Sequence, residues 1–200
     1  PFGDGSLSYD QPSGENPDSY SYDPHDPVMS VMDIDAQPMP RDQKPLDGRQ
    51  DVLVYQTEPF EKPTRFIGPV DFELWAASDA LDTDWTAKLV VVEPSGLAVN
   101  LTYGIMRARY RDGFDKEKLL DPDVTNKYVI HMNPVGIELQ PGQRLRLDVS
   151  SSDFPNFDRN HNTGKDFWSD AELKVAQQTV FHNSEMQSRL LMPLVTGSSS

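Results

Sequence analysis

The chain contains no cysteine, which excludes a disulfide framework, a thiolate zinc site and a cysteine nucleophile. No apolar run reaches the roughly 20 residues that a membrane-spanning helix needs. With 200 residues, the chain is long enough to bury a core without a structural metal or disulfide. Composition therefore predicts one folded domain with an extension, and no membrane partner.

Motifs for catalysis and for cofactors are also lacking. No glycine begins the G-x-S-x-G turn of a nucleophile elbow, and no G-x-x-x-x-G-K phosphate loop occurs. The histidines show no H-E-x-x-H or paired zinc spacing; they are His25, His131, His161 and His182. We therefore expect no catalytic triad, no metal and no cofactor. Aspartates gather in two loops, but without EF-hand spacing they are better read as Asx turns and loop caps.

Basic residues are scarce. The formal net charge is −14, from 32 acidic and 18 basic side chains. A surface of this sign repels phosphate backbones and anionic lipids, so nucleic acid and membranes are poor partners, and its simplest role is solubility. The chain opens on Pro1 without an initiator methionine, so we expect a piece of a longer polypeptide. The compartment stays open between the cytoplasm and the exterior.

Residues 1–50 differ in composition from the rest of the chain. They hold eight of the 17 prolines, with ten acidic and three basic residues and no periodic apolar stretch. Because proline fixes φ and lacks an N–H, this segment predicts an extended arm over a neighbouring surface rather than a helix or central strand. A disordered tail is the alternative. Residues 51–195 form the predicted domain, and 196–200 a flexible tail.

From residue 51 onward, short alternating runs separated by turn signals predict an all-β protein. In 70–78 the alternate residues Val70, Phe72, Leu74 and Ala76 share one face, and in 143–152 the inward set is Leu145, Leu147 and Val149, with Arg144, Arg146 and Asp148 facing water. About nine strands follow, with one or two helical turns near 116–120; the strands are expected at 51–55, 70–78, 85–93, 97–103, 105–110, 128–133, 143–152, 174–183 and 188–194. Without crossover helices, the expected fold is an antiparallel jelly-roll β-sandwich, galactose-binding-domain-like, preceded by the Pro-rich arm.

The segment 150–164 is the least usual part of the chain. It places two aromatic residues, Phe154 and Phe157, among Ser, Asn and Asp side chains that satisfy loop backbone groups locally. Arg159 in the same loop suits bidentate pairing with a carboxylate. On physical grounds a hydrogen-bonded structural loop is favoured over a functional rim loop.

Within that segment, the sequence Ser-Ser-Asp-Phe-Pro-Asn-Phe-Asp-Arg-Asn-His-Asn-Thr-Gly at 151–164 resembles a signature of one family. It is similar to the C-terminal domain of X-Pro dipeptidyl-peptidases and cocaine esterases, the CocE/NonD serine hydrolases. Further blocks resemble the family in order, at 20–28, 49–59, 68–70, 77–89, 101–111, 178–182 and 188–193. The chain departs from the family pattern after Val28 and at Lys165, where glycines are usual.

The resemblance implies a jelly roll without the nucleophilic serine, acid and histidine, which the family carries in an α/β-hydrolase domain. Its implied partners are that catalytic domain of the same polypeptide and a second copy in a homo-oligomer. The candidates for interdomain or substrate-rim contact are Tyr20, Tyr22, Phe154, Phe157 and Trp168. Two other functions stay open: a free-standing carbohydrate-binding jelly roll, and a chain that is itself a hydrolase.

Overall fold

The computed structural model describes residues 5–12, 16–31 and 41–196. Within them, nine strands form two antiparallel sheets, and two short 3₁₀ helices lie in the connections. The strands are β1 (Asp18–Tyr22), β2 (Leu53–Gln56), β3 (Thr64–Ser78), β4 (Asp84–Val92), β5 (Ala98–Arg107), β6 (Asn126–Leu139), β7 (Arg144–Ser150), β8 (Ala176–Phe181) and β9 (Arg189–Leu191); the helices are η1 (Lys44–Leu46) and η2 (Ala108–Tyr110). In the described residues neither helix is long enough to cross a bilayer.

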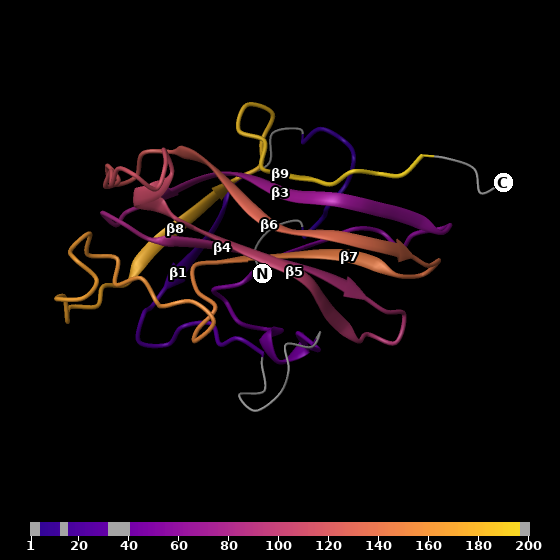
Figure 1. Cartoon of the computed structure of the whole chain (residues 1–200), viewed down its shortest axis with the longest axis horizontal. Coiled ribbons are helices and arrows are strands. Elements are labelled where there is room, and N and C mark those ends of the chain that lie inside the picture. Colours follow the sequence, from indigo (N-terminus) through magenta and orange to yellow (C-terminus); the bar gives the residue numbers. More distant parts are fainter. Residues whose placement is uncertain (1–4, 13–15, 32–40, 197–200) are drawn as a thin grey trace.

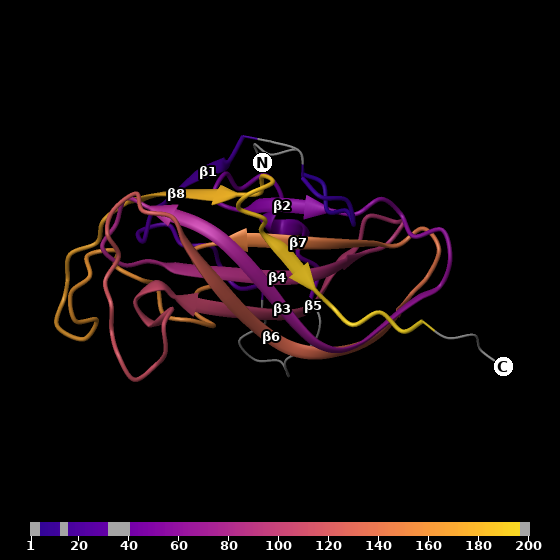
Figure 2. The ribbon, with the colours of Figure 1, turned by 90° about the horizontal axis from the view of Figure 1, so that it is seen from above.

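The two sheets pack face to face as a β-sandwich (Figure 1). One sheet has the order β1-β8-β3-β6, with β9 also paired to β3, and we call it sheet B. The other, sheet A, has the order β2-β7-β4-β5. The chain passes repeatedly between the sheets, as Figure 2 shows from above, so neighbouring strands are distant in sequence except in the β4–β5 hairpin. The predicted all-β sandwich is confirmed.

The core lies between the inner faces of the sheets. On β3 the predicted inward set from Val70 to Ala76 is buried, and on β7 the inward set Leu145, Leu147 and Val149 is buried too. Trp85 of β4 is fully buried and its ring lies 5.7 Å from that of Tyr128 on β6. Because a strand turns successive side chains to opposite faces, this alternation places one continuous apolar layer between the two sheets.

The N-terminal segment is built into the sandwich rather than lying apart from it. Asp18–Tyr22 is an edge strand of sheet B, paired with β8. Further on, Arg41 and Gln43 donate backbone N–H groups to Asn100 and Ala98 of β5. Over its described residues the segment therefore adds a strand to one sheet and covers part of the other.

This covering corrects one prediction. Arg146 and Asp148 were expected to face water, but each is 5% exposed. They pair with each other at 2.6 Å, and Asp47, next to η1, adds a contact to Arg146 at 2.7 Å. A small second cluster of Val28, Leu46 and Val52 packs on the same side. The outer face of sheet A is thus an interior surface, which alternation alone does not reveal.

Two further predictions were wrong in detail. No helix forms in 116–120, which lies in turns and irregular structure; the 3₁₀ turns are η1 and η2 instead. The strands expected at 97–103 and 105–110 are one strand, β5, that continues through Gly104. A Cβ added to Gly104 would lie 2.5 Å from the carbonyl oxygen of His131 on β6. Gly104 therefore allows the edges of the two sheets to approach closely, and it does not break the strand.

Replacing Gly104 by alanine is expected to destabilise the fold by about 1–3 kcal/mol, because backbone of β6 must move to accept the methyl group. Gly136→Ala, on β6 with nothing within 4 Å of the added Cβ, is the matched control. Urea denaturation of both variants checks this. Equal midpoints for the two alanine variants would contradict the close approach.

Arg146→Ala is expected to lower the free energy of unfolding by about 3–5 kcal/mol, because it leaves Asp148 buried without its cation. The control is Lys118→Ala, which breaks an exposed pair with Asp112 and should leave the midpoint unchanged. Thermal and urea unfolding followed by circular dichroism measure both. A loss for Arg146→Ala as small as that of the control contradicts a buried outer face.

Candidate functional site

The loop that follows β7 joins the N-terminal segment to the end of the sandwich. Phe154 donates its backbone N–H to Val28 O at 2.9 Å, and Ser30 donates its own to Phe154 O at 2.7 Å. Ser152 Oγ accepts the N–H of Val28 at 2.8 Å, and Arg159 donates to Pro24 O at 3.0 Å. The unusual segment of the sequence is therefore a structural clamp on residues 24–30, as favoured from its composition.

Two of the predicted candidates hold this clamp from inside. Tyr20 and Tyr22 are 5% and 0% exposed, and their hydroxyls bond Ser151 Oγ at 2.9 Å and Asn160 O at 3.2 Å. Burial raises the pKa of both phenols well above the ordinary value, so both stay protonated. Their rings belong to the core of this domain and are closed to a neighbouring one.

The other three candidates reach the surface in two places. Phe154 and Phe157 are half-buried in the clamp, with the Phe157 ring 5.9 Å from Tyr103 of β5. Trp168 is 88% exposed and lies in the following turn. Phe157 and Trp168 line different cavities with no lining residue in common. The structure therefore keeps the two phenylalanines within the clamp, against different partners, and leaves the tryptophan apart.

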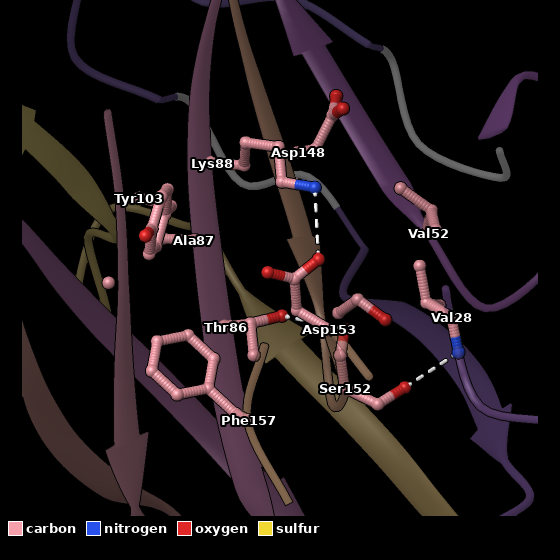
Figure 3. Close-up of a pocket in the computed structure, with 12 residues that line it drawn as sticks. Val28, Val52, Thr86, Ala87, Lys88, Tyr103, Asp148, Ser152, Asp153 and Phe157 are labelled. Atoms are coloured by element: carbon pink, nitrogen blue, oxygen red, sulfur yellow. Dashed lines mark hydrogen bonds and ion pairs between the residues drawn. The ribbon is translucent and has the colours of Figure 1, made fainter. Parts of the chain in front are cut away.

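Lys88 occupies the cavity beside the clamp, on the outer face of sheet A (Figure 3). Its ammonium group donates to Asp153 Oδ1 at 3.1 Å and to Gln43 Oε1 at 3.0 Å. The remaining space is about 20 Å³, enough for one water molecule and too small for a substrate. Lys88 thus ties together β4, the clamp and the N-terminal segment, a role that its position in an apolar run did not signal.

A second polar network lies beneath the clamp, at the start of β4. Arg107 binds Asp84 through two hydrogen bonds of 2.9 and 3.0 Å, and Arg109 binds Asp82 at 2.8 Å. The amide of Asn160 donates to both carboxylates at 2.9 Å. Burial raises the pKa of Asp84, while the hydrogen bonds of Arg107 lower it in part. Because the two arginines neutralise the two aspartates and the amide of Asn160 links both carboxylates, this network is a fixed structural unit.

Three of the aspartates in the two Asp-rich loops form ion pairs: Asp82 and Asp84 belong to this network, and Asp153 binds Lys88. No group of three or more metal-ligating side chains occurs in the part of the chain that the structure describes. The histidines pair with carboxylates at scattered positions: Asp23, Asp71, Asp170 and Asp18. These described polar side chains therefore hold the loops of the domain in place and form its contact surfaces.

Comparison with known proteins agrees with this reading. Residues 2–191 match the family described as the X-Pro dipeptidyl-peptidase C-terminal non-catalytic domain. A cocaine esterase from Rhodococcus sp. (strain MB1 Bresler) is 37% identical over 199 residues, covering 96% of this chain and 35% of the esterase. This chain thus spans about a third of that relative.

Two solved structures superimpose closely. An aminopeptidase from the marine sediment archaeon Thaumarchaeota archaeon is 30% identical with a TM-score of 0.90. An α-amino acid ester hydrolase is 29% identical with a TM-score of 0.88. Each match covers 96% of this chain and 35% of the other. With a fold of two packed sheets, a clamp made of the family signature and a match over nearly its whole length, this chain belongs to the X-Pro dipeptidyl-peptidase C-terminal non-catalytic domain family.

Proposed function

We propose that this domain serves a serine ester or peptide hydrolase by packing on an α/β-hydrolase catalytic domain of the same polypeptide and shaping access to its active site. The observation that carries the proposal is the match over residues 2–191 to a non-catalytic domain, in relatives about three times as long that are named as an esterase, an aminopeptidase and an ester hydrolase. The second candidate function, carbohydrate binding by a free-standing module, has no comparable support.

The clamp is the surface best suited to this packing. The segment that it holds exposes Met29, at 48%, beside the half-buried Phe154 of the clamp. Met29 and Phe154 form a parallel bridge, so the apolar groups stand on backbone that is already ordered. An interface needs little further ordering when its anchors are held in this way, because less conformational entropy is lost on contact. Behind it, Tyr20 and Tyr22 fix the clamp without touching the partner.

The family resemblance also implied a second copy in a homo-oligomer, and apolar groups of the N-terminal segment are one surface that such a contact could use. Tyr20, Tyr22 and Val28 are buried, and among its described residues only Tyr9 and Met29 are large, exposed apolar side chains. A homo-oligomer contact therefore has less apolar surface to use on this segment than the sequence suggested. We assign the exposed apolar surface at Met29 and the clamp to packing against the catalytic domain.

The 200-residue chain alone is expected to give no turnover of p-nitrophenyl acetate above buffer, whereas the complete polypeptide that contains it turns over the ester. The reason is that each of the four histidines, the usual general bases, pairs with a carboxylate, and the matching family is described as non-catalytic. Steady-state assays with a serine-directed inhibitor measure this. Turnover by the 200-residue chain that the inhibitor abolishes would overturn the proposal.

Met29→Asp in the complete polypeptide is expected to weaken interdomain packing by about 1–2 kcal/mol, because a charge replaces an apolar anchor. Differential scanning calorimetry should then show the domains unfolding separately, with a lower first transition. The matched control is Leu97→Asp, 44% exposed in the turn between β4 and β5 at the opposite end. Met29→Asp in the 200-residue chain should leave its melting temperature unaltered; if the complete polypeptide and the 200-residue chain lose stability equally, Met29 has no interdomain role.

A further inference from the structure

A second cavity, of about 340 Å³, opens at the end of the sandwich, where the loops after β5 and before β8 gather (left in Figure 1). Its volume is within the range of sites that bind small molecules or single side chains. It shares no lining residue with the small cavity of Lys88, and it does not include Met29 or Phe154. Any role for it is therefore independent of the packing surface described above.

One wall of this cavity is aromatic. Phe167 packs against His161 with tilted rings whose centres are 5.1 Å apart, and Trp168 meets Phe167 edge-on at 5.5 Å. The guanidinium of Arg107 lies 5.3 Å from the centre of the Phe167 ring. Trp168 itself is 88% exposed, although tryptophan is a residue that proteins usually bury or use in contacts. The wall thus offers an indole that the rest of the described chain leaves uncovered.

The charges around the wall are unequal. Arg107, Arg109 and Lys165 each have carboxylate partners in Asp84, Asp82 and Glu172. Asp158 and Asp166 also line the cavity, and within the described ranges neither forms a direct ion pair. Asp158 interacts electrostatically with Arg107, and Asp166 accepts the backbone N–H of Trp168. The cavity therefore presents two carboxylates that no cation binds directly. An anionic guest would have to compete with Asp82 and Asp84 for arginines that are already bonded.

We propose that this cavity binds the cationic side chain of a protein partner, with arginine preferred over lysine. An indole is the best aromatic acceptor for a cation, and a planar guanidinium can stack on Trp168 while its edges donate to a carboxylate. The chain already makes this contact itself, where Arg107 stacks on Phe167. A net charge of −14 favours encounter with a basic segment before any contact forms.

The test uses the 200-residue chain and Nα-acetyl-L-arginine amide as the probe. The NMR signal of the Trp168 indole N–H reports binding, since Trp85 is fully buried and Trp75 is half-buried on sheet B. A saturable shift of that signal is expected, with affinity in the millimolar range for a single side chain. The double substitution Asp158→Asn/Asp166→Asn should weaken binding roughly tenfold, and added salt should weaken it as well.

Two controls distinguish specific binding of the guanidinium group in the cavity from general electrostatic attraction to the acidic protein. Glu61→Gln removes one charge in the exposed connection between β2 and β3, away from the cavity, and should leave the affinity unchanged. Nα-acetyl-L-citrulline amide, the neutral analogue, should bind at least several-fold more weakly. Equal binding of citrulline and arginine, unchanged affinity in the double variant, or no saturable shift of Trp168 would each overturn the proposal. Because Asp158 and Asp166 are exposed, the double variant is expected to fold, which its melting temperature checks.

Discussion

The backbone exchange between Phe154 and the segment Val28–Ser30 is the contact on which the rest of this domain depends. Two N–H···O bonds of 2.9 and 2.7 Å join stretches of chain that are more than 120 residues apart. They hold the N-terminal segment beside sheet A, whose outer face carries Lys88, Arg146 and Asp148. While the N-terminal segment covers them, these side chains form buried ion pairs. If the segment were released, water would reach each pair, and the pair would contribute little to the free energy of unfolding. The clamp thereby turns a two-layer sandwich into a structure with a third, irregular layer.

Periodicity predicted the inner layer of the fold well, and it failed where a third layer intervenes. Val70 to Ala76 and Leu145 to Val149 alternate as expected because burial on one face is a local property of a strand. Arg146 and Asp148 alternate equally well and are nevertheless buried, since the segment that covers them is about 100 residues away in sequence. A pattern read along the chain contains no information about such a cover. The prediction of separate strands on either side of Gly104 failed for a related reason. The close contact that favours glycine there is with β6, and a pattern read along β5 does not reveal it.

The site residues divide in the same way. The signature at 151–164 identified the family and the loop, yet it did not distinguish residues that face inward from those that face outward. Tyr20 and Tyr22 belong to the core, while Trp168 stands in water. Asp82, Asp84 and Asn160 drew no attention as a group, because what unites them is hydrogen bonding between parts of the chain that are distant in sequence. The contact of Lys88 with Asp153 was missed for the same reason. The separation of adjacent residues Phe157 and Asp158 into different cavities is likewise a property of the fold alone.

The placement of buried charge indicates what this non-catalytic domain has to keep fixed. The pairs Arg107–Asp84, Arg109–Asp82, Arg146–Asp148 and Lys88–Asp153 all lie on the outer face of sheet A or at the loop end, whereas the space between the sheets is filled mainly by apolar side chains. Hydrophobic residues of similar volume often give equal or greater stability than a buried ion pair. What paired, hydrogen-bonded charges add is a defined geometry, since Asn160 can satisfy Asp82 and Asp84 together in one arrangement only when both loops are in place. The domain therefore fixes most firmly the loops that form its clamp and its aromatic cavity, and these are the surfaces that it can offer to another protein.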